Sequence, residues 1–267
     1  MWLAAFSISQ GLRSLSIIRR AKLLVQNAQF LVWKRKYPSA AFKDYFLEIV
    51  RKDLGRGLPH PTLGPNLSRE PFGSAGQKTF PSLARRYGIT PDDTCVDYGC
   101  GTLRVGVHAI KYLDPRRYWG MDISDFFLAQ GLELIGGDLV RDKTPNLRVI
   151  SPETVAEVAA AKPKLLFSVN VLLHVHPDEL REYLGNIVNI IGASGTGAIA
   201  GVWSKTRTTQ IARQSWVHSK SRLREATEAA GGSATFIPRI ARGHQANGLI
   251  EIRQLLRGGA DNVKGWD

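Results

Sequence analysis

Short β-rich runs alternate with longer helix-like segments from Phe80 onward, and this alternation restricts the possible folds more than any other feature of the chain. The runs that read as strands are 94–98, 117–121, 146–150, 164–169, 196–202, 234–238 and 249–253. The segments with helical periodicity or helix-ending glycines are 81–87, 103–112, 126–135, 153–160, 177–191 and 222–230. Strands that alternate with helices form parallel sheets, and the crossover helices cover both faces. We therefore expect an α/β fold with a doubly wound, mostly parallel, seven-stranded sheet and a ligand site at the carboxyl ends of its strands.

Composition divides the 267 residues into four parts. Residues 1–52 read as a basic amphipathic helical extension, 53–79 as a Gly/Pro-rich flap or linker, 80–256 as the main domain and 257–267 as a tail. More than half of the formal net charge of +13 belongs to the extension, because residues 1–43 hold eight Lys or Arg and no Asp or Glu. The basic composition therefore does not by itself indicate a nucleic-acid-binding protein.

The extension has three interpretations that the sequence leaves open. Its apolar and basic residues predict one or two amphipathic helices within residues 2–33. In the first interpretation, residues 1–43 lie on an anionic membrane surface. In the second, the apolar side packs on the body of the protein and the charges are solvated. In the third, this acid-free, Arg- and Ser-containing segment is an organellar transit peptide.

The chain has only two cysteines, Cys95 and Cys100, and their spacing matches neither a disulfide framework nor a paired metal-ligand motif. We therefore expect a reducing compartment and no metal site. No apolar run reaches the roughly 20 residues of a membrane-spanning helix, and residues 1–8 lack the features of a secretory signal. These observations predict a cytoplasmic protein, placed at the membrane surface under the first interpretation of the extension.

A glycine turn follows the first predicted strand, which ends in Asp97-Tyr98-Gly99-Cys100-Gly101-Thr102 and leads into a predicted helix. Glycines at such a turn let a cofactor approach the backbone while the helix amides face it. Asp122 ends the next predicted strand, about 20 residues downstream, where a carboxylate can accept both hydroxyls of a ribose. This spacing fits a dinucleotide and S-adenosylmethionine (SAM) equally well.

Two charged residues beside the turn favour SAM. Asp97, immediately before the turn, would repel a pyrophosphate but suits the cationic amino group and sulfonium of SAM. Arg104, expected in the first turn of the helix, opposes the helix dipole and so suggests a partner anion, either Asp97 or the carboxylate of the cofactor. The alternative is a solvent-facing arginine whose stem covers apolar surface.

Four segments, 97–104, 112–115, 118–123 and 168–174, together resemble the Rossmann-like class I SAM-dependent methyltransferases. They are most similar to a bacterial-type branch whose glycine turn reads Gly-Cys-Gly-x-Leu-Arg, and the resemblance covers about residues 72–252. It implies that Asp97, Gly99 and Gly101 contact the methionine part of SAM, that Asp122 holds the ribose, and that residues 168–170 line the cofactor. The cofactor-binding residues expected in these segments are Asp97, Gly99, Cys100, Gly101, Arg104, Asp122, Ile123, Ser168 and Asn170.

Outside those segments, residues 72–77 resemble a segment that closes over the cofactor in this branch, which adds Gly73 and Gln77 to the expected site. The sequence also departs from the family in two places. Leu103 stands where many members have a third glycine. Residues 150–153 lack the acid and apolar pair that often holds adenine, so no residue is assigned to that contact.

The acceptor side has one candidate base, His174, in the segment after the fourth strand. Methyl transfer to oxygen requires removal of a proton, which suits a histidine near its ordinary pKa; the alternative is a structural histidine opening the next helix. His176, directly before Pro177, reads as a helix-entry residue. Residues 204–224 carry six basic residues and should overhang the acceptor side, either to bind an anionic acceptor or an RNA backbone, or as a solvated loop.

The predicted activity is SAM-dependent methyl transfer to a small-molecule acceptor such as a saccharide or lipid-linked intermediate. Nucleic acid is less favoured as a substrate, because the segment after the fourth strand lacks the Asn-Pro-Pro-Tyr or Asp-Pro-Pro-Tyr motif typical of base amino methylation. Two other functions remain as alternatives. One is an RNA methyltransferase, with RNA binding that depends on Arg207 and Arg213. The other is a non-catalytic, membrane-associated SAM-binding protein.

Overall fold

The computed structural model describes residues 17–55 and 72–255. Most of the predicted linker, all of the predicted tail and the first 16 residues of the extension lie outside the described residues. The division of the chain into four parts therefore remains a prediction.

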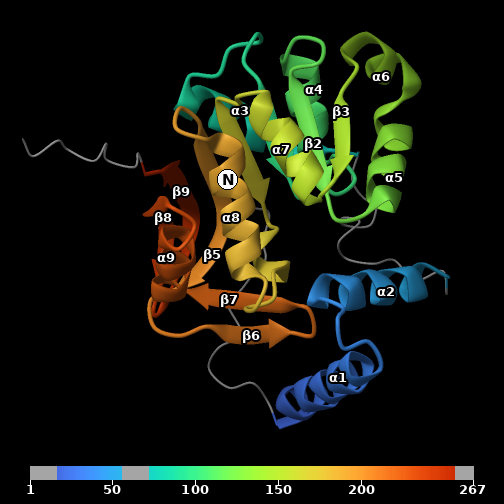
Figure 1. The fold of residues 1–267 in the computed structure, drawn as a ribbon, viewed down its shortest axis with the longest axis vertical. Coiled ribbons are helices and arrows are strands. Elements are labelled where there is room, and N and C mark those ends of the chain that lie inside the picture. Colours follow the sequence, from blue (N-terminus) through green and yellow to red (C-terminus); the bar gives the residue numbers. More distant parts are fainter. Residues whose placement is uncertain (1–16, 56–71, 256–267) are drawn as a thin grey trace, which may run out of the picture.

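A single mixed sheet forms the centre of the molecule, with its main strands in the order β3-β2-β1-β4-β5-β9-β8 (Figure 1). The first five are parallel, β9 runs antiparallel to β5, and β8 runs antiparallel to β9. Their bounds are β1 Cys95–Tyr98, β2 Tyr118–Asp122, β3 Asn146–Val149, β4 Leu165–Val169, β5 Thr196–Ser204, β8 Gly232–Arg242 and β9 Gln245–Gln254. The predicted Rossmann-like, mostly parallel sheet is confirmed with these seven strands, and a hairpin described below brings the total in the described residues to nine.

Helices cover both faces of this sheet, as the alternation of segments predicted. The helices of the main body are α3 Thr79–Tyr87, α4 Gly106–Tyr112, α5 Asp125–Ile135, α6 Gly137–Lys143, α7 Pro152–Ala160, α8 Leu180–Ile191 and α9 Lys220–Glu228, with two 3-10 turns, η3 Ser74–Gly76 and η4 Leu172–His174. Sequence signals fix several ends. Gly88 ends α3 with φ 59°, and Ser151 begins α7 by accepting a hydrogen bond from the Thr154 amide.

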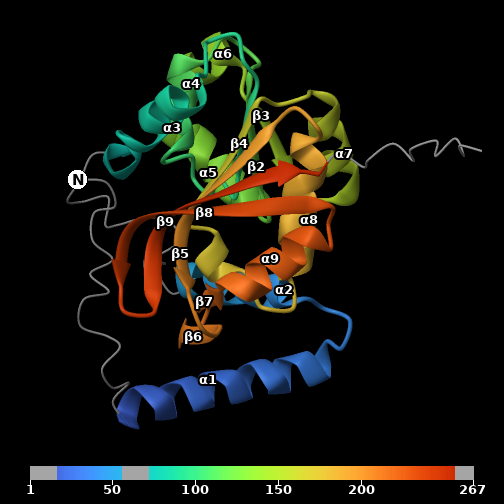
Figure 2. The same cartoon turned by 90° about the vertical axis from the view of Figure 1, so that its left-hand side faces the viewer.

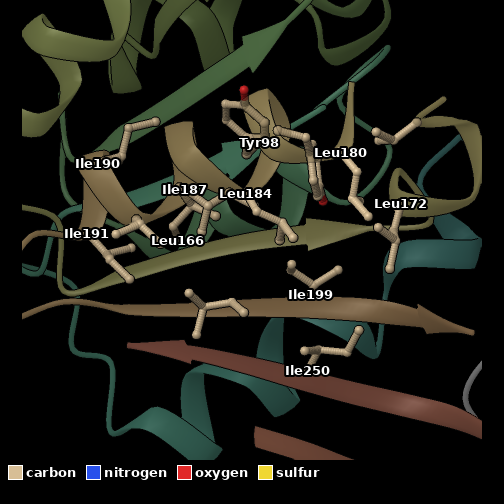
Figure 3. Close-up of a cluster of buried hydrophobic side chains, with 14 of the residues drawn as sticks. Tyr98, Leu166, Leu172, Leu180, Leu184, Ile187, Ile190, Ile191, Ile199 and Ile250 are labelled. Atoms are coloured by element: carbon tan, nitrogen blue, oxygen red, sulfur yellow. The ribbon is translucent and has the colours of Figure 1, made fainter. Parts of the chain in front are cut away.

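Each face of the sheet has its own apolar core, because side chains alternate between the faces along a strand. Val96, Leu166 and Ile199 point to the face covered by α7, α8 and α9, where they join the cluster shown in Figure 3. Cys95, Leu165 and the neighbouring Phe167 point to the other face, where α3, α4 and α5 pack. The alternation also decides the orientation of the polar residues near the strand ends.

Several predicted boundaries in the main body were wrong in detail. Helix α4 begins at Gly106 and not at 103, because Leu103 has φ 64°, a left-handed conformation that no α-helix contains. Helix α8 begins at Leu180 and not at 177. The closing strands β8 and β9 are longer than predicted and meet at a turn in which Gly243 has φ 56°.

The basic stretch after β5 is more ordered than the expected loop. It forms an antiparallel hairpin of β6 Thr209–Ala212 and β7 Ser215–Ser219, and β7 pairs with the last two residues of β5. This hairpin extends the sheet beyond the end of β4, on the side where the parallel strands finish (Figure 1).

The extension forms two helices, α1 Ile17–Lys36 and α2 Phe42–Gly55. They lie beside the hairpin and the carboxyl end of the sheet (Figure 2). A third apolar cluster joins them to the main body. That cluster combines residues of α2 with Phe127 of α5 and Trp216 of β7. Packing on the body, the second interpretation of the extension, is therefore observed for α2 and for one side of α1. None of the described helices is long and apolar enough to cross a membrane.

Candidate functional site

The backbone of the glycine turn has positive φ angles at three of its residues. Gly99, Gly101 and Leu103 have φ values of 82°, 52° and 64°, so alternate residues lie in the left-handed region. A Cβ on Gly99 would lie 2.4 Å from the side chain of Val171, whereas a Cβ on Gly101 would meet no atom within 4 Å. The turn thus packs closely on one side and leaves space at Gly101, where the resemblance placed a cofactor.

Leu103 explains how this chain dispenses with a third glycine. Its side chain is fully buried, and a Cβ on Gly131 of α5 would lie only 2.8 Å from its Cγ. The absence of a side chain at Gly131 therefore makes room for Leu103, and this close packing holds the leucine in a conformation that costs free energy for a residue with a Cβ.

Asp97 and Asp122 are two buried carboxylates at the carboxyl ends of the neighbouring strands β1 and β2. Asp97 accepts a hydrogen bond from the Tyr118 hydroxyl at 3.1 Å. Burial raises the pKa of Asp97 to about 8; the Tyr118 hydrogen bond opposes this rise, and the charge of Asp122 adds to it. Burial also raises the pKa of Asp122 to about 6, although the Gly101 amide donates to its Oδ2 at 2.8 Å. Neither carboxylate has an ion-pair partner within residues 17–55 and 72–255.

Arg104 lies between the turn and α4, outside the helix in which it was expected. Its side chain is half-buried, and burial lowers the pKa of the guanidinium. It forms no ion pair with Asp97 or with any other acid of the described part of the chain. Asp97, one of the two partners predicted for Arg104, therefore does not pair with it. The other predicted partner, the carboxylate of the cofactor, remains the candidate.

The Thr102 hydroxyl adds a polar atom that sequence reasoning did not single out. Its Oγ1 is buried in the turn and has no hydrogen-bond partner among the described residues. A buried hydroxyl without a partner is costly, and a ligand that supplies one removes the cost. The residues present thus fit SAM. Asp97, which pairs with no described cation, suits its ammonium and sulfonium, and Asp122 suits its ribose hydroxyls. Arg104 and the Thr102 hydroxyl suit its carboxylate.

The segment after β4 divides its residues between the core and the exposed edge. Ser168 faces α8, as the alternation requires, and its hydroxyl lies 2.7 Å from both the Tyr98 carbonyl and the Tyr183 hydroxyl. The expected cofactor contact of Ser168 would therefore have to involve its backbone. Asn170 is exposed and has φ 61°. Its backbone N–H donates to the Ala200 carbonyl at 3.1 Å, so its side chain is not used in this bond and lies at the edge of the sheet.

The remaining predicted cofactor residues surround the turn at different depths. Cys100 is buried, and burial raises the pKa of its thiol well above the ordinary value. Gly73 is buried; its carbonyl lies 2.8 Å from Nε2 of His108 in α4, and a Cβ on it would lie 3.5 Å from the Arg104 carbonyl. Gln77, just past η3, is exposed, and Ile123 packs against the α2 cluster. The structure therefore brings the 73–76 segment to Arg104 and leaves Gln77 at the surface.

His174 ends η4, between the hairpin and α2. Its Nδ1 lies 3.0 Å from the Gln214 carbonyl, and its ring centroid lies 5.8 Å from that of Phe46. A carbonyl oxygen only accepts, so in the neutral ring Nδ1 carries the proton and Nε2 carries the basic lone pair. His176 instead stacks on Phe42 at 4.9 Å inside the aromatic cluster, and burial lowers its pKa.

The basic residues of 204–224 have different environments. Arg213 donates to Gln29 Oε1 and to the Tyr45 hydroxyl, and it lies over the Tyr45 ring at 5.6 Å. It therefore joins the hairpin to the extension. Lys205, Arg207, Arg222 and Arg224 are exposed.

Comparison with known proteins gives a fold but no sequence family. No family model matches the chain, and no curated protein matches it in sequence. Magnesium protoporphyrin IX methyltransferase from Synechocystis PCC 6803 with bound SAH is similar in structure, with TM-score 0.51 and 16% identity over 79% of this chain and 97% of that one. The PH0226 protein from Pyrococcus horikoshii OT3 is also similar, with TM-score 0.50 and 11% identity over 73% of this chain and 96% of that one. The chain therefore has a fold similar to that of the class I SAM-dependent methyltransferases.

Proposed function

We propose that this protein binds SAM at the glycine turn and transfers its methyl group to a small-molecule acceptor, such as a saccharide or a lipid-linked intermediate. The observation that carries the proposal is the pair of buried carboxylates, Asp97 and Asp122, which no cation of the described ranges neutralises. Burying a carboxylate is costly unless a cation or donors compensate it. A ligand with an ammonium, a sulfonium and a ribose supplies those groups. A dinucleotide also has ribose hydroxyls for Asp122, but its pyrophosphate would be repelled by Asp97.

The cofactor supplies an electrophilic methyl group on a sulfonium, so the protein has mainly to bind and orient. Asp97 holds the positive end of the ligand, Asp122 accepts from the ribose hydroxyls, and Arg104 with Thr102 holds the carboxylate. Asn170 borders the same edge from β4. Fixing the methyl donor and the acceptor in line can contribute several kcal/mol to lowering the barrier.

His174 is our candidate for the base that removes the acceptor proton. It lies directly after β4 at the carboxyl end of the sheet, and the Gln214 carbonyl fixes its tautomer. The exposed basic residues after β5 suit an acceptor that carries a phosphate or carboxylate. The similar Synechocystis enzyme is named for a small-molecule substrate, which supports this class of acceptor over RNA.

Titration calorimetry with SAM tests the cofactor part of the proposal. We expect wild type to bind, Asp122→Asn and Arg104→Gln each to bind at least about tenfold more weakly, and Asp125→Asn and Arg117→Gln to bind as wild type. The two control residues are exposed, lie close in sequence to the test residues and lose the same charge. Absence of SAM binding by the wild type would refute the proposal.

The transfer itself is tested with tritiated SAM and extracts separated into lipid, polar small-molecule and RNA fractions. Label in either small-molecule fraction, reduced by His174→Gln with unchanged SAM affinity, is the expected result. Label in RNA, reduced by Arg207→Gln, would replace the acceptor. SAM binding without label in any fraction would identify a non-catalytic SAM-binding protein.

A further inference from the structure

The outer side of α1 carries an apolar surface that no described residue covers. Leu24, Val25, Leu31 and Val32 are 71%, 59%, 58% and 64% exposed, and Ala28 between them is exposed as well. Positions 24, 25, 28, 31 and 32 share one side of a helix, because residues three, four and seven apart lie on the same face. We define these five residues as the outer face of α1.

The opposite side of α1, which carries Phe30 and Trp33, packs on the body, and Asn27 on the flank of the helix adds a second contact, so the outer face points away from the body. Asn27 and Gln210 of β6 exchange two hydrogen bonds of 2.9 and 3.0 Å between their side-chain amides. The ring of Phe30 packs edge-on against that of Phe42 of α2, with 5.1 Å between the ring centroids, and the rings of Trp33 and Tyr45 have centroids 5.2 Å apart. In both ribbon views α1 forms one end of the molecule, beyond α2 and the β6–β7 hairpin (Figures 1 and 2).

The net charge of this end of the molecule is positive. Residues 17–43 contain seven Lys or Arg, and residues 203–224, which include the hairpin against α1, contain six; neither range contains an acid. Helix α2 is balanced, with three acidic and three basic residues, and its Glu48 accepts a hydrogen bond from Trp33 and pairs with Lys52. Arg35 and Lys36 are exposed at the end of α1, next to the outer face.

We propose that the outer face of α1 docks this protein on an anionic membrane surface, with Leu24, Val25, Leu31 and Val32 entering the interface and the exposed Arg35 and Lys36 contacting lipid headgroups. An exposed apolar stripe flanked by cations is the arrangement by which interfacial helices bind anionic lipid. A second copy of the chain fits less well, because two acid-free helices repel each other. RNA would use the charges but leave the apolar stripe in water.

Vesicle sedimentation tests the proposal with the full-length protein. We expect binding to phosphatidylcholine vesicles that contain roughly 30% phosphatidylglycerol, and at least about tenfold weaker binding to pure phosphatidylcholine. Leu24→Gln with Leu31→Gln should weaken binding to the anionic vesicles about tenfold or more, because it removes the inserted apolar area. Arg35→Gln and Lys36→Gln should each weaken it about fivefold at low salt.

The matched control is Leu134→Gln with Leu255→Gln, which makes the same exchange at two other exposed leucines, 39% and 53% exposed, on the main body. It should bind like wild type, and circular dichroism of both double variants should show unchanged helix content. Equal loss in the two double variants, or no binding of wild type to anionic vesicles, overturns the proposal. So does a wild-type dimer that Leu24→Gln with Leu31→Gln converts to monomer, or binding to transfer RNA but not to vesicles. SAM affinity is measured separately, without lipid. A negative vesicle experiment would therefore leave the proposed SAM-dependent function standing, and a negative SAM titration would leave the proposed membrane-docking surface standing.

Discussion

SAM binding should release protons, because the cofactor brings positive charge to Asp97 and hydrogen-bond donors to Asp122, and both effects favour the ionised carboxylate. Asp97, with a pKa of about 8, is roughly 90% protonated at pH 7, and Asp122, with a pKa of about 6, roughly 10%. If the ligand returns both pKa values to the ordinary 3.8, binding releases about one proton at pH 7 and about 1.5 at pH 6. SAM affinity should therefore rise more than tenfold from pH 6 to pH 7.

The assay is titration calorimetry in buffers of different ionisation enthalpy, in which the slope of the observed enthalpy counts the protons. Asp97→Asn should reduce the release at pH 7 to about 0.1, whereas Asp122→Asn should keep about 0.9. The exposed Asp125→Asn should match wild type. No proton release by the wild type at pH 7, or full release by Asp97→Asn, would refute the assignment of Asp97 as the buried partner of the ligand cation.

Three further changes test the packing around the site. Gly106→Ala places a Cβ 2.3 Å from the Tyr118 hydroxyl, so it should lower the free energy of unfolding, measured by urea titration, by about 1–3 kcal/mol. Adding Tyr118→Phe should restore part of this loss, and no loss in Gly106→Ala would mean that the Tyr118 ring can move. Phe42→Ala removes a buried ring that stacks on His176 and should lower the free energy of unfolding by about 3 kcal/mol. A protease should then cut residues 17–55 before the main body, and equal cleavage rates in the two parts would contradict docking of α2 through this ring. Burial lowers the pKa of His218 to about 4, so the unfolded chain binds the proton more readily and stability should fall by about 3 kcal/mol as the pH drops from 6.5 to 4. His218→Gln should flatten that dependence in thermal melts, and an unchanged pH profile would assign the acid sensitivity to other groups.

The order of strands and helices was readable from the sequence because each element repeats with its own period. The strand runs, the helix-ending Gly88 and the Ser151 cap are local signals, and local signals survive without knowledge of the partners. The start of α4 was not readable. The left-handed conformation of Leu103 goes with its packing against Gly131, a residue far along the chain, and local sequence does not show that contact.

The site was readable as a list but not as an arrangement. Asp97, Asp122 and the glycines follow from position at strand ends. Ser168 could have been assigned to the core by counting two residues from Leu166, since alternate residues share a face. Two features of the site could not be predicted from the sequence. The Tyr118 hydrogen bond to Asp97 joins residues that are distant in the chain, and the Thr102 hydroxyl lacks a partner among the described residues only because of how the chain folds around it.

The sequence by itself determined the α/β class, the glycine turn with its two acids, and the basic, acid-free character of residues 1–43. Only the tertiary structure decided that Arg104 lacks an acidic partner among the described residues, that residues 209–219 form a hairpin, and that this hairpin receives α1 and α2. The physical reason is that periodicity and charge are properties of short segments. Burial, pairing and the direction in which an apolar face points depend on which segments meet, and that is fixed only when the chain has folded.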